Sequence, residues 1–551
     1  MKTRFTLNLL IGLFLLATTG IQAQFQWAIQ AGGGTYDKGK RIVTDATGNN
    51  YTAGEFAGNV DFDPGPGTTT ISPAGCYLLK LDGSSNFGWV KSWGAYTVDG
   101  ISRDASGNIL LCGFFYNTVD FDPGPATYTL MSINGTLPNT YAMKLDPNGN
   151  FLWAVRFGDS NTSAKDISND ASGNVLISGG YSGIQDFDPS ASTFTIGTTN
   201  NVSGYVLKLD PAGNFTWVKE VRNASLGTSA SIFGVETDGT GNVITTGVFN
   251  GTADFDPSAS TYTLNATTFA YASSFVQKLD ASGNFVWAKA IGGPTVTMSS
   301  YAVAIDGSNN VYSCGSFGSS VDFDPSAGTT SLTATGSSDA YVWKLDANGN
   351  FVWARGMGNN SWTIRLDAVG DVYSIAYATS GEDVDPGPGT YTVTGSYIQK
   401  LDAGGNFVWA RGYGVFPSFN DISVNGSDIY FTGRFNGTVD FDPDAPVYNL
   451  VMGFGGYALF ISKLSAYPVS VNEYGMNTSN LKVFPNPSNG EINLSFEKPY
   501  TGSLQVYDVS GKQIHSQTLT KETELKLDLT KYNRGIYFVK TEEASFKIVI
   551  Q

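Results

Sequence analysis

From residue 24 onward, the sequence consists of short runs in which apolar and polar residues alternate, separated by turns of glycine, asparagine and aspartate. Alternation with a period of two predicts half-buried β-strands. In the phrase K-L-D-x-x-G-N-F-x-W, two such runs flank a loop in which aspartate accepts backbone hydrogen bonds and glycine adopts a left-handed conformation. Residues 42–56 carry a second phrase of the same kind. The two phrases predict two β-hairpins, and therefore a four-stranded antiparallel unit.

This unit recurs along the chain with a spacing of about 64 residues. The phrases F-x-W, K-L-D and D-F-D-P each occur seven times when degenerate copies are counted. The F-x-W tryptophans are Trp27, Trp89, Trp153, Trp217, Trp287, Trp353 and Trp409. Lone hairpins are marginal in water, so the units must stack to bury their faces. After D-F-D-P, a Thr/Tyr-rich run predicts an extra edge strand or small hairpin on each unit.

The phase of the repeat predicts a closed ring. The repeats open with a lone F-x-W strand, residues 25–30, and end with a K-L strand, residues 458–466, that no F-x-W follows. The first strand can therefore pair with the last and complete the seventh unit. We predict an all-β fold, a seven-bladed β-propeller over residues 24–466 that is closed by its N-terminal strand. Glycines near the end of the second strand, such as Gly54, are expected to allow close backbone approach.

The repeat unit, with its G-N turns and its K-L-D strand leading into F-x-W, resembles the bacterial seven-bladed β-propeller repeat family called SBBP. The resemblance extends from about Phe25 to Ala466. It implies an extracellular propeller without a fixed activity. The D-F-D-P insertion looks like a variant of this repeat.

The C-terminal residues follow another pattern, with V-F-P-N-P at 483–487, V-Y-D-V-S-G-K at 506–512 and G-I-Y-F-V-K at 535–540. These phrases resemble the type A C-terminal sorting domain of the type IX secretion system, although the final Gln551 departs from the basic or apolar end usual there. The resemblance implies export from a Gram-negative bacterium by the Sec pathway and then by the type IX machinery, with release or surface attachment. Alternation alone predicts a β-sandwich of about seven short strands over 481–551, after a linker at 467–480.

Residues 1–23 predict a secretory signal peptide. Lys2 and Arg4 precede an apolar core at 9–17, and Ala23 ends a cleavage site of small residues. The apolar core is too short to span a bilayer, and no other segment is apolar enough to do so. We therefore expect a secreted or outer-surface protein, and a monomer.

Composition excludes several classes of protein. Charged residues make up 15% and aromatic residues 13% of the 551 residues, which fits neither a disordered chain nor a helical bundle. A net charge of −16 disfavours nucleic-acid binding. The single histidine, His515, excludes Ser-His-Asp and HExxH chemistry. The three cysteines, Cys76, Cys112 and Cys314, match no zinc or disulfide framework and are interpreted as apolar strand residues.

The D-F-D-P phrase is the best candidate for a site. Its two aspartates lie two residues apart on an extended strand and point the same way, an arrangement that suits Ca²⁺. The alternative is structural: the phenylalanine anchors the loop, the aspartates accept backbone hydrogen bonds and the proline sets the turn. We predict no cofactor other than this calcium. The candidate ligands are Asp61, Asp63, Asp120, Asp122, Asp186, Asp188, Asp254, Asp256, Asp322, Asp324, Asp383, Asp385, Asp440 and Asp442.

Other candidates lie outside the repeated phrases. The F-x-W tryptophans are predicted to pack between blades, because they recur at equivalent positions. Trp93, Trp343 and Trp362 break the pattern, and Trp343 and Trp362 are candidates for a binding face. A glycosidase pair could be drawn from the few glutamates of this region or from an aspartate such as Asp159. Those glutamates are Glu55, Glu220, Glu236 and Glu382.

We expect no catalytic residues and a non-catalytic role as a binding or scaffold module for an extracellular glycan or protein. Two alternatives stay open at this point. One is a carbohydrate-active hydrolase or lyase, which should show charged residues that break the sevenfold symmetry within one pocket. The other is a calcium-stabilised structural surface protein.

Overall fold

The computed structural model describes residues 23–32, 36–133, 137–159, 161–197, 202–223, 228–266, 271–293, 298–444, 447–453, 455–465, 481–485, 488–508, 513–532, 535–541 and 545–550. Within these ranges the chain forms strands and turns and no helix, so the all-β prediction is confirmed. The chain divides into two compact units, Met1–Pro468 and Val469–Gln551. The predicted signal peptide, apart from Ala23, and the predicted linker lie outside the described residues.

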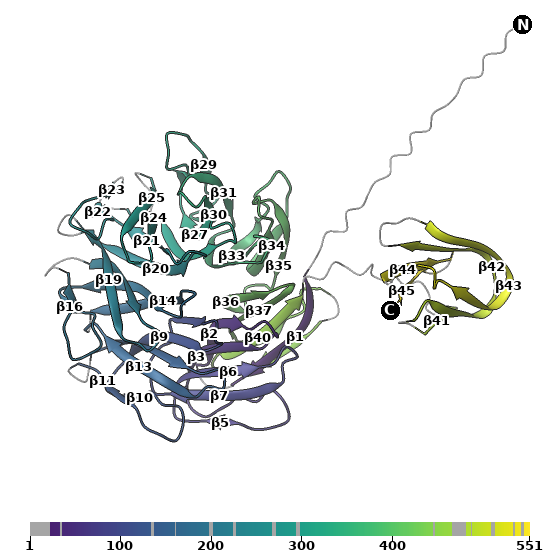
Figure 1. Ribbon diagram of the computed structural model, residues 1–551, viewed down its shortest axis with the longest axis horizontal. Coiled ribbons are helices and arrows are strands. Elements are labelled where there is room, and N and C mark those ends of the chain that lie inside the picture. Colours follow the sequence, from purple (N-terminus) through teal and green to yellow (C-terminus); the bar gives the residue numbers. More distant parts are fainter. Residues whose placement is uncertain are drawn as a thin grey trace, which may run out of the picture. The chain divides into compact units, whose positions relative to one another are not determined.

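The first unit contains seven antiparallel sheets with four main strands each, here called sheets 1 to 7 (Figure 1). Sheet 1 is β2 (Lys38–Thr44), β3 (Asn50–Phe56), β6 (Gly75–Leu81) and β7 (Phe87–Trp93); sheet 2 is β8 (Gly100–Arg103), β9 (Ile109–Phe115), β12 (Asn139–Leu145) and β13 (Phe151–Phe157). Sheet 3 is β14 (Thr162–Asn169), β15 (Val175–Ser182), β18 (Val202–Leu209) and β19 (Phe215–Asn223); sheet 4 is β20 (Ala230–Thr237), β21 (Val243–Phe249), β24 (Ser273–Leu279) and β25 (Phe285–Ile291).

Sheets 5 to 7 repeat the same order. Sheet 5 is β26 (Ser299–Ile305), β27 (Val311–Phe317), β30 (Asp339–Leu345) and β31 (Phe351–Met357); sheet 6 is β32 (Asn360–Leu366), β33 (Val372–Asp383), β34 (Thr392–Leu401) and β35 (Phe407–Gly412). Sheet 7 is β36 (Ser418–Asn425), β37 (Asp428–Phe435), β40 (Ala458–Ser465) and β1 (Gln24–Ala31). The outer strand of sheet 7 is therefore the first strand of the chain, paired antiparallel with β40 as its phase predicted.

The seven sheets follow one another around a ring, in a propeller-like arrangement (Figure 1). The first strand of each sheet contacts the first strand of the next, in the order β2, β8, β14, β20, β26, β32 and β36. β36 in turn contacts β2, so the last sheet meets the first. These first strands are therefore the innermost strands, and F-x-W lies on the outer ones.

The repeated phrases join each sheet to the next. Trp353, on the outer strand of sheet 5, donates its Nε1–H to the carbonyl of Ala403 in the K-L-D turn of sheet 6, at 3.2 Å. Lys344 on the adjacent strand donates to the same carbonyl, also at 3.2 Å. A Cβ on Gly405 of that turn, which has φ +78°, would lie about 3.0 Å from the Trp353 ring, so the turn glycine lets the ring pack closely. The predicted packing of tryptophan between units is confirmed.

Equivalent contacts recur around the ring. Trp153 bonds to Pro211 O and Trp287 to Ala347 O, and at the junction of sheets 7 and 1 Trp27 bonds to Gly83 O at 3.1 Å. The K-L-D lysine also forms a buried ion pair within its own sheet, as between Lys278 and Asp238 at 2.8 Å. Each K-L-D lysine in sheets 2 to 7 has such a partner.

The insertion between the second and third strands forms a small hairpin, as the Thr/Tyr-rich run predicted. The hairpins are β4 (Val60–Asp61) with β5 (Thr70–Ile71), β10 (Thr118–Asp120) with β11 (Thr129–Met131), β16 (Gln185–Asp186) with β17 (Thr195–Ile196), β22 (Thr252–Asp254) with β23 (Thr263–Asn265), β28 (Ser320–Asp322) with β29 (Ser331–Thr333), and β38 (Gly437–Asp440) with β39 (Asn449–Met452). In sheet 6 the ends of β33 and β34 pair in the same way.

The innermost strands carry a recurring irregularity. In β2 the pairing with β3 skips Lys40, so that Gly39 pairs with Gly54 and Arg41 with Ala53. A Cβ on Gly54 would lie 2.0 Å from the carbonyl oxygen of Lys38. The glycine near the end of the second strand is thus needed for close backbone approach, as predicted, and the backbone it approaches is the bulged inner strand of its own sheet.

The second unit has one hydrogen-bonded sheet among its described residues. Its strands are β41 (Leu481–Phe484), β42 (Glu491–Asp508), β43 (Gln513–Asp528), β44 (Gly535–Lys540) and β45 (Ser545–Ile550). The prediction of about seven short strands is wrong, because β42 and β43 are long. Register shifts near Tyr500 let this pair bend without ending, and Ile492, Leu494, Leu504 and Val506 share one core.

Candidate functional site

The D-F-D-P phrases form the same loop in every sheet. In sheet 4, Asp254 Oδ1 accepts hydrogen bonds from Asp256 N at 3.0 Å and from Tyr262 N at 2.8 Å, while Asp256 Oδ1 accepts from Ser258 N at 2.9 Å. Phe255 between them is buried and packs against Phe275, with ring centroids 4.9 Å apart. The same bonds occur at Asp61, Asp63, Asp120, Asp122, Asp186, Asp188, Asp322, Asp324, Asp383, Asp385, Asp440 and Asp442.

This geometry explains the phrase without a ligand. Among the described residues, no group of three or more His, Cys, Asp or Glu side chains could hold a metal ion. Each aspartate pair therefore lacks a third side-chain ligand, whereas Ca²⁺ takes six to eight oxygens. Carbonyl groups and water would have to supply the remainder. Calcium binding at these loops stays a prediction.

Two of the off-pattern tryptophans belong to the core. Trp343 is fully buried in sheet 5, and Trp93 is buried with its indole N–H 3.3 Å from Tyr141 Oη. The prediction that Trp343 marks a binding face is therefore wrong, because its position on the third strand faces the neighbouring sheet. Trp362 is 41% exposed and stands on the innermost strand of sheet 6. Cys76, Cys112 and Cys314 are buried free thiols, as predicted.

The bulge position brings together the residues that differ most between the repeats. The bulged residues are Lys40, Lys165, Phe233, Tyr301, Trp362 and Asn420, and Asp99 holds the equivalent place just before β8. Sheets 4, 5 and 6 therefore present three aromatic residues in succession, and the other four sheets present polar or charged ones. Because these strands are the innermost of the ring, the two groups face its centre from two sides, and this region is here called the channel mouth. Bulges re-aim side chains and are over-represented beside functional sites.

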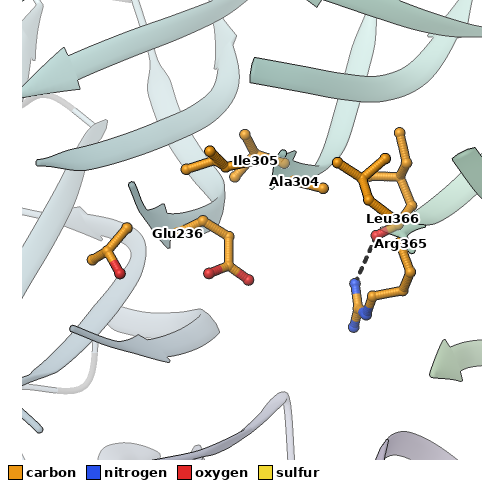
Figure 2. Close-up of a pocket in the computed structure, with 8 residues that line it drawn as sticks. Glu236, Ala304, Ile305, Arg365 and Leu366 are labelled. Atoms are coloured by element: carbon orange, nitrogen blue, oxygen red, sulfur yellow. Dashed lines mark hydrogen bonds between the residues drawn. The ribbon is translucent and has the colours of Figure 1, made fainter. Parts of the chain in front are cut away.

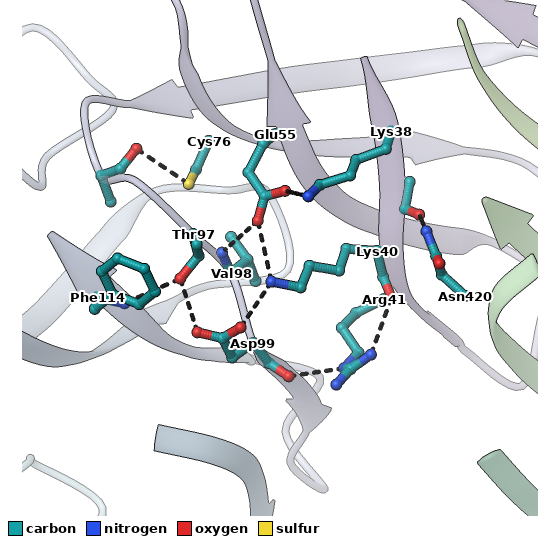
Figure 3. A network of polar contacts seen from close by, with 12 residues as sticks. Lys38, Lys40, Arg41, Glu55, Cys76, Thr97, Val98, Asp99, Phe114 and Asn420 are labelled. Carbon is teal, nitrogen blue, oxygen red and sulfur yellow. Dashed lines mark hydrogen bonds and ion pairs between the residues drawn. The ribbon is translucent and has the colours of Figure 1, made fainter. Parts of the chain in front are cut away.

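Lys40 and Asp99, on the polar side of the mouth, are held by their own contacts (Figure 3). Glu55 pairs with Lys38 at 2.7 Å and with Lys40 at 3.2 Å, and Lys40 pairs with Asp99 at 2.7 Å. Thr97 donates its hydroxyl to Asp99 at 2.7 Å. Burial alone would lower the pKa of Lys40, but Asp99 and Glu55 raise it above its usual value. This network links sheet 1 to sheet 2, and its charged side chains are paired with one another.

A cavity of about 200 Å³ lies among the innermost strands, a few residues farther along the strands than the aromatic bulges. Its walls come from β20, β26 and β32, the same three strands that carry the aromatic bulges. Glu236 and Arg365 lie on opposite sides, with Ala304 and Ile305 between them (Figure 2). The cavity breaks the sevenfold symmetry, because the position of Glu236 and Arg365 holds valine, serine or alanine in the other sheets.

Arg365 is fixed by Asp421. Its Nη2 lies 3.1 Å from Asp421 Oδ1, and its Nη1 donates to Thr363 Oγ1 and to the carbonyl of Ile364. Asp421 also accepts the backbone N–H of Ile42 in sheet 1 at 3.0 Å. Both oxygens of the Asp421 carboxylate therefore accept hydrogen bonds, whereas Nε of Arg365 makes no hydrogen bond to any described residue.

The opposite wall carries an acid. Ser168 donates its hydroxyl to Glu236 Oε2 at 2.8 Å, and the backbone N–H of Thr237 also interacts with the carboxyl. Burial, and after it the nearby Asp166, raise the pKa of Glu236 to about 7. Asp166 accepts the backbone N–H groups of Val235 and Ile167, and burial raises its pKa as well. Glu236 is thus an acid that exchanges its proton near neutral pH.

The remaining glutamates are not brought together with Glu236. Glu55 belongs to the network of sheets 1 and 2, Glu220 bonds to Tyr181 and Arg222, and Glu382 lies on β33. Asp159 follows β13, at the outer edge of sheet 2. The predicted glycosidase pair therefore does not form from these residues. Arg365, Phe233 and Tyr301 belong to no motif, and only their departure from the repeat distinguishes them in the sequence.

Comparison with known families identifies the C-terminal segment. Residues 482–551 match the family model described as the secretion system C-terminal sorting domain. The resemblance seen in the sequence is confirmed: this segment is a type IX sorting domain, and it supports export through the type IX machinery. No helix in the described parts of the chain is both long and apolar enough to cross a membrane.

Similarity to other proteins is distant for the repeats. An uncharacterized WD repeat-containing protein of Acanthamoeba polyphaga mimivirus is 29% identical over 159 residues, which is 27% of this chain and 11% of that protein. A Bacteroides caccae protein of unknown function has a TM-score of 0.30 at 9% identity, covering 61% of this chain and 89% of its own. The pyranose dehydrogenase PQQ domain of Coprinopsis cinerea has a TM-score of 0.28 at 8% identity, covering 67% and 93%.

Proposed function

We propose that the first unit is a seven-bladed β-propeller of the SBBP type that acts as a non-catalytic extracellular binding module, carried out of the cell by its sorting domain. The asymmetric channel mouth carries this proposal. The repeated phrases have internal roles, in turns, seams and insertions, whereas the variable residues gather where the inner strands begin. A purely structural ring has no need of three aromatic bulges on the same strands that line a cavity.

The test is a binding screen with the protein as residues 24–551. The immobilised wild type is compared with a triple variant, Phe233→Ala, Tyr301→Ala and Trp362→Ala, against glycan and protein panels, with and without calcium. Ligands that bind the wild type and not the variant support the proposal, provided that both proteins melt at the same temperature. If every ligand binds both proteins equally, the mouth is not the binding site and the proposal fails.

A carbohydrate-active enzyme is the second candidate. One observation favours it: a carboxylic acid whose pKa is near 7, such as Glu236, can serve as the general acid of a glycosidase. The binding role is preferred because Asp166, the nearby acid, spends its oxygens on backbone N–H groups and so offers no free carboxylate for the second role. Polysaccharide turnover that is lost in Glu236→Gln and kept in Glu220→Gln would establish the enzyme.

The calcium-stabilised structural protein is kept as a proposal for the D-F-D-P loops. Its support is the pairing of two carboxylates in each loop. This role and the binding role can coexist, because the loops belong to the insertions and the cavity to the innermost strands.

A further inference from the structure

We propose that the channel mouth beside sheets 4, 5 and 6 binds a neutral oligosaccharide, with one sugar unit between Glu236 and Arg365 and the adjoining unit on Phe233, Tyr301 and Trp362. This inference rests on the proposed binding function and names the ligand class and the subsites.

The three strands set the two subsites at a fixed spacing. Phe233, Tyr301 and Trp362 each stand three residues before Glu236, Ala304 and Arg365, respectively, on β20, β26 and β32. At about 3.3 Å per residue, the aromatic and polar groups are separated by roughly 10 Å along the strands. A ligand that contacts both must be longer than one sugar ring. The cavity of about 200 Å³ is below the roughly 300–1,000 Å³ of drug-sized sites, so it holds only one end of that ligand.

The polar subsite selects hydroxyl groups. Arg365 Nε makes no hydrogen bond to a described residue, so it can donate to a ligand. On the facing wall, the Glu236 carboxyl is contacted by Ser168 and by the Thr237 backbone N–H, and its remaining lone pairs can accept from a ligand. A sugar hydroxyl both donates and accepts, so neighbouring hydroxyls can satisfy both groups. Arg365 is already neutralised by Asp421 at 3.1 Å, so a ligand anion gains little from it and meets the Glu236 carboxylate. Charge therefore favours a neutral ligand.

The aromatic subsite suits the apolar face of a sugar. Phe233 and Tyr301 meet edge to face, with centroids 6.2 Å apart, and Trp362 is 41% exposed. A pyranose presents C–H groups on its face and hydroxyls at its edge, so it can stack on aromatic rings while its hydroxyls stay hydrated. Across the mouth, Lys40 and Asp99 are paired with each other, so the ligand is held from one side.

The test is calorimetric titration of residues 24–551 with glucose, mannose and xylose and with their β-linked tetrasaccharides. Tetragalacturonate and tetralysine serve as the anionic and cationic probes. We expect at least one neutral tetrasaccharide to bind about tenfold or more tightly than its monosaccharide, and both charged probes to bind more weakly. Trp362→Ala and Glu236→Gln should each weaken that binding by about tenfold. Tyr96→Ala, which removes a 63% exposed aromatic of sheet 2, is the matched control and should leave it unchanged.

Four results would overturn the inference. Tighter binding of tetralysine or tetragalacturonate would assign a charged ligand. Equal affinity for mono- and tetrasaccharides would remove the second subsite, and loss of binding in Tyr96→Ala with none in Trp362→Ala would move the site to sheet 2. If no sugar binds but the screen finds a protein that requires Phe233, Tyr301 and Trp362, the sugar inference fails while the proposed binding function stands.

Discussion

The seams, where the outer strand of one sheet contacts the turn of the next sheet, and the channel mouth are formed by the same repeat. They differ in which residues recur from one repeat to the next. At the seams, the lysine, the tryptophan and the turn glycine recur, and four of the tryptophans donate to the turn of the next sheet: Trp27, Trp153, Trp287 and Trp353. At the mouth, the bulge is retained while its residue changes from Lys40 to Phe233 to Trp362. Sevenfold constancy is what stacking requires, whereas recognition of a ligand requires one particular side. The comparison predicts that seam substitutions affect stability and mouth substitutions affect binding.

The strongest test of this comparison is to replace one tryptophan of the seams and one tryptophan of the mouth by alanine. Trp353→Ala should lower the free energy of unfolding by about 3–5 kcal/mol, because it removes a 7% exposed ring and its hydrogen bond to Ala403. Trp362→Ala should lower it by less than about 1 kcal/mol, because Trp362 is 41% exposed and belongs to no buried cluster of the described core. Urea unfolding followed by circular dichroism measures both. Equal losses would remove the distinction between seam and mouth.

The buried ion pairs within the sheets give the next largest effect. Lys278→Met should cost about 3 kcal/mol, because it leaves the buried Asp238 carboxylate without its cation at 2.8 Å. Adding Asp238→Asn should recover part of the loss, since the uncompensated charge is then gone. The pKa of Asp238 is lowered well below its usual value despite burial, by hydrogen bonds from Lys278 and Asn242. Its contribution is therefore present above pH 4 and declines as the pH falls further.

A double-mutant cycle at pH 7 checks this interpretation. The two single variants and the double variant are compared in unfolding free energy. A double variant whose loss equals the sum of the two single losses would show that the two residues do not act as a pair.

The seams were predictable from sequence because they repeat, and the mouth was not because it varies. The F-x-W spacing indicated packing, and the lone strand at residues 25–30 indicated closure; β1 indeed pairs with β40. By contrast, the bulge that groups Phe233, Tyr301 and Trp362 depends on backbone register, which alternation does not specify. Trp343 was misassigned for a related reason: an unusual residue on a strand does not tell whether its side faces solvent or the next sheet. Arg365 is recognisable only from its facing partners, Glu236 and Asp421.

The acid at the mouth gives a pH-dependent effect of intermediate size. Because burial and Asp166 raise the pKa of Glu236 to about 7, the folded state holds a proton there that the unfolded state releases near pH 4.5. This stabilising contribution is present at low pH and is lost as the pH rises from about 5 to 7. Glu236→Gln should remove this loss of stability between pH 5 and pH 8. The free energy of unfolding at pH 8 minus that at pH 5 should therefore be about 1–2 kcal/mol higher in the variant than in the wild type, after allowing for partial solvent screening.

Unfolding at pH 5 and pH 8 measures the effect. Glu491→Gln in the second unit, an exposed acid paired with Lys526, is the control and should leave the pH dependence of the ring unchanged. An unchanged pH dependence in Glu236→Gln would place the Glu236 carboxyl in full solvent contact, against its position in the cavity.

The smallest effects are expected at the D-F-D-P loops, and they separate the structural interpretation from the calcium proposal. Asp254→Asn keeps Oδ1 as the acceptor for Asp256 N and Tyr262 N, so on the structural interpretation it should change the melting temperature by no more than about 1 °C. Asp254→Ala removes both bonds and should cost about 1 kcal/mol. On the calcium proposal, the wild type should instead melt at a substantially lower temperature in EDTA and recover with Ca²⁺. In Asp254→Asn the neutral side chain would be a weaker Ca²⁺ ligand, so on the calcium proposal the melting temperature of this variant should change less with EDTA. Because seven loops share the phrase, even a weak ion would act seven times, so an unchanged melting temperature in EDTA would exclude calcium as a stabiliser of the ring and leave the aspartates as acceptors for the loop.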